Sequence, residues 1–228
     1  MSTLSLNLTL EAVTKRYSRA SVFAPVSFTA SSGKVLSITG SNGSGKSTLL
    51  KIIAGVTAPS RGICSWSFGD SESIPTNPNR EKRNVDFQRD LQKILGFVSP
   101  YLELYYELTA IEHVQFVAEL KGYHITNDEA VSELTSFGLD PMIARSERTL
   151  KQYSSGMQQR VRLAMAFIAA PKVLLLDEPS SNLDEVGIGI LFRRIEDAVE
   201  KGALAIIATN DEREKNLASK EISLNSIA

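Results

Sequence analysis

The chain is poor in cysteine: Cys64 is the only one among 228 residues, so no disulfide can form within it. It must therefore fold by burying apolar side chains, and with 43% hydrophobic residues it is long enough to do so as a single domain over residues 1–228. No leader of positive charge followed by an apolar run opens the sequence. We therefore expect a protein of the reducing cytoplasm.

Long apolar runs and net charge are also lacking. The longest apolar stretches, residues 173–176 and 203–208, are short against the roughly 20 residues that a membrane-spanning helix needs. The formal net charge of -1 gives no overall basic surface of the kind that binds nucleic acid. We expect no nucleic-acid partner, and any membrane role must depend on another protein.

Histidine is scarce as well. The only two, His113 and His124, do not stand in the spacing of metal ligands, and a structural or solvated role is expected for both. The sequence indicates neither a zinc site nor a nucleophile triad.

What the sequence does contain is a regular alternation of strand and helix patterns. Apolar and polar residues alternate over residues 4–13, which is typical of a half-buried strand in an antiparallel sheet edge. The polar stretch 67–89 reads as a long exposed loop. Further strands are expected over 22–28, 35–39, 173–176 and 203–208, and helices over 46–54, 109–120, 128–137 and 155–169. The pattern predicts an α/β fold with an inserted helical subdomain.

A glycine-rich segment, Gly-Ser-Asn-Gly-Ser-Gly-Lys-Ser, occupies residues 40–47 between a predicted strand and a predicted helix. It fits the P-loop pattern in the structural context that the pattern requires. Glycines let backbone N–H groups wrap around phosphate, and the helix N-terminus adds positive potential. An ordinary turn is the alternative. The candidate nucleotide-binding residues are Gly40, Ser41, Asn42, Gly43, Ser44, Gly45, Lys46, Ser47 and Thr48.

A pair of acids at the end of the apolar run 173–176 completes a site for MgATP. Lys46 would neutralise the β- and γ-phosphates, while the Ser47 hydroxyl and Asp177 would serve Mg²⁺. Neighbours at a strand end face opposite ways, so Glu178 is free to polarise an attacking water. A solvated acidic turn is the alternative for this pair.

Two further segments, Tyr-Ser-Ser-Gly-Met-Gln-Gln-Arg over residues 153–160 and Ser-Asn-Leu-Asp over 181–184, give the chain a resemblance to the ABC (ATP-binding cassette) ATPases. The resemblance covers about residues 13–209 and preserves the order of the motifs. It implies a P-loop parallel-sheet core over about 1–98 and 171–228. A helical subdomain that carries the signature motif would cover about 99–170.

The resemblance assigns roles to four more residues. Ser154 and Gly156 match the family's signature, which closes on a γ-phosphate held by a second protomer, although a plain helix cap is the alternative. Asp184 matches an aspartate that communicates between the two ATP sites, or is simply an acid at a helix start. Tyr17 stands where an aromatic stacks on adenine, or is an ordinary tyrosine.

Within the signature segment Tyr153, Ser155 and Met157 differ from the commonest family letters, and outside it two positions that affect the mechanism depart from the family pattern. Ser99 stands where a glutamine usually contacts the metal and the attacking water, and Asn210 stands where a histidine usually contacts γ-phosphate. Serine is shorter, and asparagine can donate a hydrogen bond but cannot carry a positive charge. We expect Glu178 to carry more of the catalysis, which is slower or differently controlled.

The resemblance implies an ATPase subunit that dimerises around two MgATP. It would work peripherally at the inner face of the membrane and power transport through integral membrane permease subunits. Residues 107–113 and 120–122 resemble exporter-type cassettes. Two alternatives remain open, namely an ATP-gated clamp with weak hydrolysis and a non-transport relative that acts on nucleic acid or ribosomes. The cargo and the identity of the second ATPase protomer are not determined by the sequence.

Overall fold

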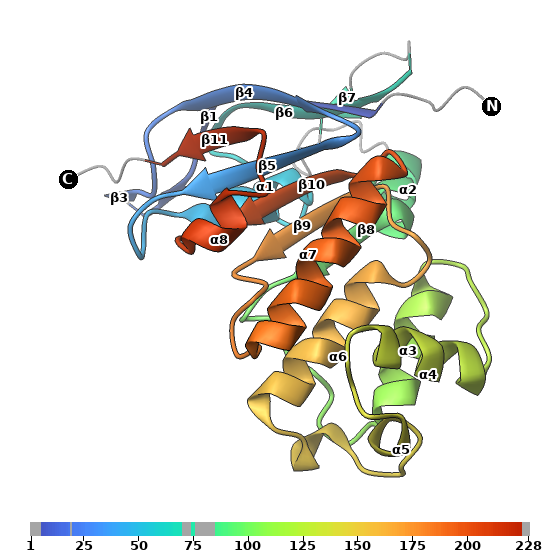
Figure 1. Cartoon of the computed structure of the whole chain (residues 1–228). Coiled ribbons are helices and arrows are strands. Elements are labelled where there is room, and N and C mark those ends of the chain that lie inside the picture. Colours follow the sequence, from blue (N-terminus) through green and yellow to red (C-terminus); the bar gives the residue numbers. More distant parts are fainter. Residues whose placement is uncertain (1–5, 19, 70–73, 76–84, 225–228) are drawn as a thin grey trace.

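The computed structural model describes residues 6–18, 20–69, 74–75 and 85–224, and its centre is a five-stranded parallel sheet (Figure 1). The strand order is β11-β5-β10-β9-β8. Ala208 pairs with both Ile38 and Asp177, so the carboxyl ends of the three central strands meet at one edge. The strands are β5 (Lys34–Thr39), β8 (Leu95–Val98), β9 (Val173–Asp177), β10 (Leu204–Ala208) and β11 (Lys220–Ser223).

An antiparallel sheet of order β4-β1-β6-β7 covers one face of the parallel sheet. In β1, Leu6, Leu8 and Leu10 are buried while the residues between them are half-buried, which confirms the predicted alternation; residues 4–5 lie outside the described part. The strands are β1 (Leu6–Thr14), β4 (Val26–Ser31), β6 (Arg61–Phe68) and β7 (Ile74–Pro75), and β2 (Arg16–Tyr17) pairs separately with β3 (Ala20–Ser21).

The parallel sheet is buried on both faces, which explains the continuous apolar runs of β9 and β10. Leu174 and Leu176 contact the helices, whereas Leu175 faces the side of the antiparallel sheet. The helices are α1 (Lys46–Ile53), α2 (Val85–Ile94), α3 (Ala110–Leu120), α4 (Asn127–Ser136), α5 (Pro141–Ala144), α6 (Ser155–Phe167), α7 (Glu185–Glu200) and α8 (Glu212–Lys215). A 3-10 turn covers Leu150–Gln152.

The predicted helices 46–54, 109–120, 128–137 and 155–169 are confirmed within about two residues by α1, α3, α4 and α6. Both α3 and α4 begin with a capping box. The hydroxyl of the first threonine, Thr109 or Thr126, accepts from the backbone N–H of a glutamate three residues later, and the carboxylate of that glutamate accepts from the backbone N–H of the threonine. These side-chain caps fix where the two helices begin.

Two sequence predictions were wrong. The stretch 67–89, predicted as a long exposed loop or insertion, is not all loop: β6 continues to Phe68, β7 follows, and α2 begins at Val85, with Leu91 buried in its second half. Residues 70–73 and 76–84 lie outside the described part. The stretch 22–28 is not one strand, since β4 begins only at Val26. Val22 and Phe23 instead leave the sheet and contact the phosphate-loop region. The sequence analysis did not predict α5, α8 or β11, and it anticipated α7 only through the alternative of a helix start at Asp184.

Helices α3 to α6 lie between β8 and β9 in the chain and extend away from the sheet (Figure 1). One hydrophobic cluster joins them to the sheet, from Val98 and Leu174 to Leu134 and Phe137. We therefore propose residues 99–170 as a subdomain of a single domain over 1–228, without a core of its own. Within the described ranges, no helix is both long and apolar enough to span a membrane.

Candidate functional site

The glycine-rich segment joins β5 to α1 at the carboxyl edge of the parallel sheet. Gly40, Gly43 and Gly45 have φ values of 147°, 82° and 96°, which side-chain-bearing residues rarely adopt. A Cβ atom on Gly45 would lie 2.5 Å from Val22 and 2.7 Å from Phe23. The segment after β3 therefore presses against this loop, which explains both the glycine and the break in the predicted strand.

Helix α1 presents an uncapped N-terminus to this loop. Its N-cap, Gly45, offers no side-chain hydrogen bond, and its first turn contains no acidic residue. The first N–H groups of the helix thus have no acidic side chain to oppose the binding of an anion. The nearly buried Lys46 side chain folds back, and its Nζ donates to the carbonyl oxygens of Gly40 at 2.7 Å and Ser41 at 3.4 Å. A phosphate in the loop would be attracted both by the N-terminus of α1 and by the ammonium group of Lys46.

Asp177, at the end of β9, lies beside this loop. Ser99 Oγ donates to its Oδ2 at 3.3 Å, and the carboxylate is only 3% exposed. Burial raises the pKa of Asp177, while hydrogen bonds from Ser47 and Ser99 and the charges of Lys46 and Lys51 act in the opposite direction. A carboxylate flanked by two hydroxyls is a set of oxygen donors of the kind that Mg²⁺ prefers. The residues fit the metal that the sequence predicts.

Glu178 lies in different surroundings from its neighbour. Glu178 is exposed, whereas Asp177 is buried. That the two carboxylates face opposite ways stays a prediction. The backbone of Glu178 has a φ of 47°, and its N–H donates to the carbonyl of Ala208 at 2.9 Å. A left-handed backbone costs a non-glycine residue about 1–3 kcal/mol and is found preferentially at functional sites.

Asn210, which follows β10, reaches the glycine-rich loop. Its Nδ2 donates to Oδ1 of Asn42 at 3.1 Å, and both side chains are exposed. The structure thus brings together Asn210 with the loop, and Ser99 with Asp177. Both positions that depart from the family pattern lie beside the predicted phosphate and metal residues.

The segment with Ser154 and Gly156 lies elsewhere. Ser154 is the N-cap of α6 and accepts from the N–H of Met157 at 3.2 Å. The start of α6 lies away from α1, at the far side from the sheet (Figure 1). A Cβ on Gly156 would come within 2.7 Å of the carbonyl oxygen of Asn182, so glycine lets the loop after β9 approach. The structure does not bring this segment to the phosphate loop of its own chain.

Asp184 is the N-cap of α7, the role that the sequence left open as an alternative. Its Oδ1 accepts from the N–H of Gly187 at 2.8 Å and from Arg160 Nη2 at 2.7 Å. Arg160 also donates to the carbonyl of Phe137 at 2.6 Å. Asp184 therefore ties the start of α7 to α6.

Tyr17 lies in β2 with its ring 56% exposed. Lys15 Nζ is 5.2 Å from the ring centroid and also donates to Thr57 Oγ1 at 3.1 Å and to the Ala58 carbonyl at 2.7 Å. The lysine lies over the ring, and the exposure of Tyr17 leaves it accessible to a stacking partner.

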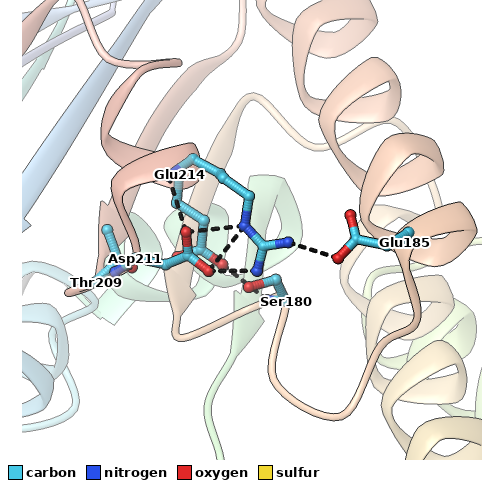
Figure 2. A network of polar contacts seen from close by, with 6 residues as sticks. Ser180, Glu185, Thr209, Asp211 and Glu214 are labelled. Atoms are coloured by element: carbon cyan, nitrogen blue, oxygen red, sulfur yellow. Dashed lines mark hydrogen bonds and ion pairs between the residues drawn. The ribbon is translucent and has the colours of Figure 1, made fainter.

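The sequence analysis missed a network that joins the segment after β10 to the loop after β9 (Figure 2). Arg213 donates to Asp211 at 2.6 Å and to Glu185 at 2.9 Å. Glu214 Oε1 accepts from the backbone N–H of Ser180 at 2.9 Å. No motif could reveal these contacts, because α8 has only four residues and its partners are about 30 positions away.

Comparisons with known proteins agree on one family. The family model described as ABC transporter matches residues 23–181. Similar proteins include the cytochrome c biogenesis ATP-binding export protein CcmA of Cupriavidus necator, 31% identical, with 85% of this chain and 79% of that protein covered. The histidine transport ATP-binding protein HisP of Pseudomonas aeruginosa is 33% identical, with 90% and 81% covered.

A similar solved structure is a dimeric ATP-binding cassette in a post-hydrolysis state, bound to ADP and Pi. It superposes with a TM-score of 0.81 at 27% identity, and the match covers 96% of this chain and 94% of that one. The match confirms the predicted α/β fold over nearly the whole chain.

Proposed function

We propose, because the chain belongs to the ABC transporter family, that it pairs with a second ATP-binding protomer and powers transport through separate permease subunits in the membrane. The chain is an ATPase subunit of a transporter, and it binds ATP. Its proposed place is peripheral, at the inner face of the membrane, with no nucleic-acid partner. The likeness of residues 107–113 and 120–122 to exporter-type cassettes stays a prediction.

One observation carries the proposal: an open helix N-terminus, a buried lysine and a buried carboxylate meet at one edge of the sheet. The loop residues 40–48 would hold the phosphates, and Lys46 would exchange its bonds to Gly40 and Ser41 for phosphate oxygens. Tyr17 would stack on the adenine. The carboxylate of Asp177 and the hydroxyl of Ser47 would hold Mg²⁺, which when bound neutralises phosphate charge.

The exposed Glu178 is the proposed general base. It would take a proton from a water whose oxygen bonds to the γ-phosphorus, while the bond from that phosphorus to the bridging oxygen breaks and ADP leaves with the electron pair. Asn210, whose side chain contacts Asn42 of the loop, would donate a hydrogen bond near the phosphates. Ser99 acts through its hydrogen bond to Asp177.

The geometry of the signature segment supports pairing. Ser154 and Gly156 begin α6 away from the chain's own phosphate loop, so the phosphate that they would contact must belong to another protomer. The similar cassette solved with ADP and Pi is itself a dimer. We propose that Asp184, beside the start of α6, lies at the same interface.

The central test is the rate of ATP hydrolysis by the wild type and by Glu178→Gln. We expect the variant to bind ATP but to lose roughly a hundredfold or more in kcat, because general-base catalysis contributes about 10²–10⁴-fold. Glu200→Gln, at the exposed end of α7, is the matched control and should match the wild type. Equal and near-zero rates for the wild type and Glu178→Gln would instead favour an ATP-gated clamp.

Pairing and partners are tested separately. With ATP and Mg²⁺, Glu178→Gln should elute as a dimer in light-scattering chromatography and return to a monomer when the nucleotide is removed. Affinity capture should recover a polytopic membrane protein. Co-sedimentation with ribosomes or DNA, without such a protein, would overturn the transport role.

A further inference from the structure

The loop that carries Glu178 is held by several separate contacts. The N–H of Glu178 donates to the carbonyl of Ala208, and the carbonyl of Pro179 accepts from the buried Gln159 Nε2 at 2.8 Å. The N–H of Ser180 donates to Glu214 Oε1 at 2.9 Å. Three successive residues are thus fixed through their backbones by β10, α6 and α8. A strained φ of 47° at Glu178 needs such support, because it persists only where the surroundings determine it.

Glu214 is an unusual residue for this task. It belongs to a four-residue helix, yet it is only 1% exposed, and burial raises the pKa of its carboxyl. Interactions with Ser180 and Thr209 favour the charged form, while Asp211 opposes it. Its second oxygen, Oε2, has no hydrogen-bond partner within bonding distance among the described residues. Burying such a group costs free energy, so its retention calls for a physical reason.

The neighbouring Arg213 offers a direct comparison (Figure 2). It also spans from the segment after β10 to the region after β9, through Glu185, but its side chain is 47% exposed and that of Glu185 is 86% exposed. Exposed ion pairs of this kind contribute little to stability, because water and salt screen them. We therefore expect the buried Glu214 contact to contribute more to the position of the loop than the exposed Arg213 contact does.

We propose that Glu214 is a positioning residue for ATP hydrolysis, which holds the backbone two residues after Glu178 and so orients the Glu178 carboxylate toward the attacking water. The proposal rests on the general-base role of Glu178. Glu214 itself need not touch ATP, because its hydrogen bond ends at the Ser180 backbone. Glu214 also interacts with the Thr209 side chain, which follows β10, and this contact holds Glu214 in place beside Ser180.

The test measures kcat and KM for ATP in the wild type, Glu214→Ala, Glu214→Gln and Arg213→Ala. We expect Glu214→Ala to lose about tenfold in kcat with KM unchanged within about twofold, since a misplaced catalytic group costs rate rather than binding. Glu214→Gln should restore most of the rate, because its amide oxygen can accept the Ser180 N–H. Arg213→Ala should behave as the wild type.

A second arm combines Glu214→Ala with Glu178→Gln. If Glu214 acts through Glu178, the double variant has the same residual rate as Glu178→Gln alone. Thermal unfolding and binding of a fluorescent ATP analogue check that each variant is folded. If Glu214→Ala does not fold, Glu214→Met, which fills the volume without an acceptor, takes its place.

Several results would overturn the proposal. These are a folded Glu214→Ala or Glu214→Met with the wild-type kcat, an equal loss in Glu214→Gln, a rise in KM alone, or a further loss on top of Glu178→Gln. A wild type without any ATP hydrolysis would contradict the proposed role of Glu178 and this inference together. An active wild type with an indifferent Glu214 would contradict this inference only.

Discussion

Lys46 in the phosphate loop and Lys121 at the end of α3 are both almost fully buried, with 6% and 8% of their surface exposed. Lys46 lies at an uncapped helix N-terminus, held by two carbonyls that a phosphate could replace, and its charge acts on Asp177. Lys121 has one long contact, 3.4 Å to the carbonyl of Ile168, and burial lowers its pKa to about 8. Burial of a charge does not by itself mark a binding site; the groups around it do.

The half-buried carboxylate of Glu133 in the helical region and the buried carboxylate of Asp177 differ in the same way. In the helical region Glu133 is paired with Arg194 at 2.6 Å, and the guanidinium lies over the rings of Phe137 and Phe167. Burial still raises the pKa of Glu133, although the arginine opposes this. No described residue forms an ion pair with Asp177; its partners are the hydroxyls of Ser47 and Ser99, and the charges of Lys46 and Lys51 act on it. One carboxylate is neutralised within the fold, while the other can still take a cation.

The largest effect expected from this comparison is on ATP binding. Lys46→Met should weaken the binding of ATP at least a hundredfold. Lys46 would make two charge-assisted hydrogen bonds to phosphate, and each is worth about 1.5–3 kcal/mol. The free energy of unfolding should change little, since the lysine gives up only bonds to the loop. Titration with a fluorescent ATP analogue measures the first quantity. Urea unfolding, followed by the buried and only tryptophan, Trp66, measures the second.

The corresponding substitution in the helical region, Lys121→Met, should change the free energy of unfolding and leave ATP binding unchanged. Below pH 8, Lys121 is charged in both the folded and the unfolded state, and the folded state carries the full cost of burying that charge. A fall from 10.5 to about 8 corresponds to about 3 kcal/mol, part of which the lost bond to Ile168 offsets. Lys121→Met should therefore raise the free energy of unfolding by about 2 kcal/mol at pH 7.

The pH dependence of the Lys121 effect has a definite sign. Between pH 8 and 10.5 the folded lysine loses its proton before the unfolded one does, so the burial cost shrinks and the advantage of Lys121→Met disappears. Urea unfolding at several pH values measures it, and Lys51→Met, a half-buried lysine, is the control. An ATPase rate that falls with Lys121→Met, or a stability gain that does not depend on pH, would contradict the structural role.

The phosphate loop was predictable from the sequence because its chemistry imposes a fixed spacing. The loop that contains Gly45 must follow a strand, and Lys46 must begin a helix. The residues within this short segment therefore suffice to predict its geometry. The alternation of β1 was predictable because side chains of a strand point alternately to its buried and its more exposed face. The continuous apolar runs of β9 and β10 were predictable because a parallel sheet is buried on both faces. In these segments the local structure is determined by residues that are close together in the sequence.

The other features depend on residues far apart in the chain. The strand predicted over residues 22–28 breaks because Phe23 is needed against Gly45, and α2 exists because Leu91 can be buried by elements outside its own segment. Glu214 reads as one acid in a run of charged residues. Only the tertiary structure shows that it is buried beneath Ser180.

The smallest effect concerns Asp184, which joins the two regions by capping α7 and pairing with Arg160 of α6. Asp184→Ala should lower the free energy of unfolding by about 1 kcal/mol, the usual worth of an N-cap, because the ion pair is largely exposed on the aspartate side. Asp184→Asn keeps the cap and removes the charge, so it is the matched control. Urea unfolding and ATPase rate are measured for both variants. If capping is the whole role, Asp184→Asn matches the wild type in both measurements. A stable Asp184→Asn that has lost ATPase activity would show instead that the carboxylate acts across the proposed dimer interface.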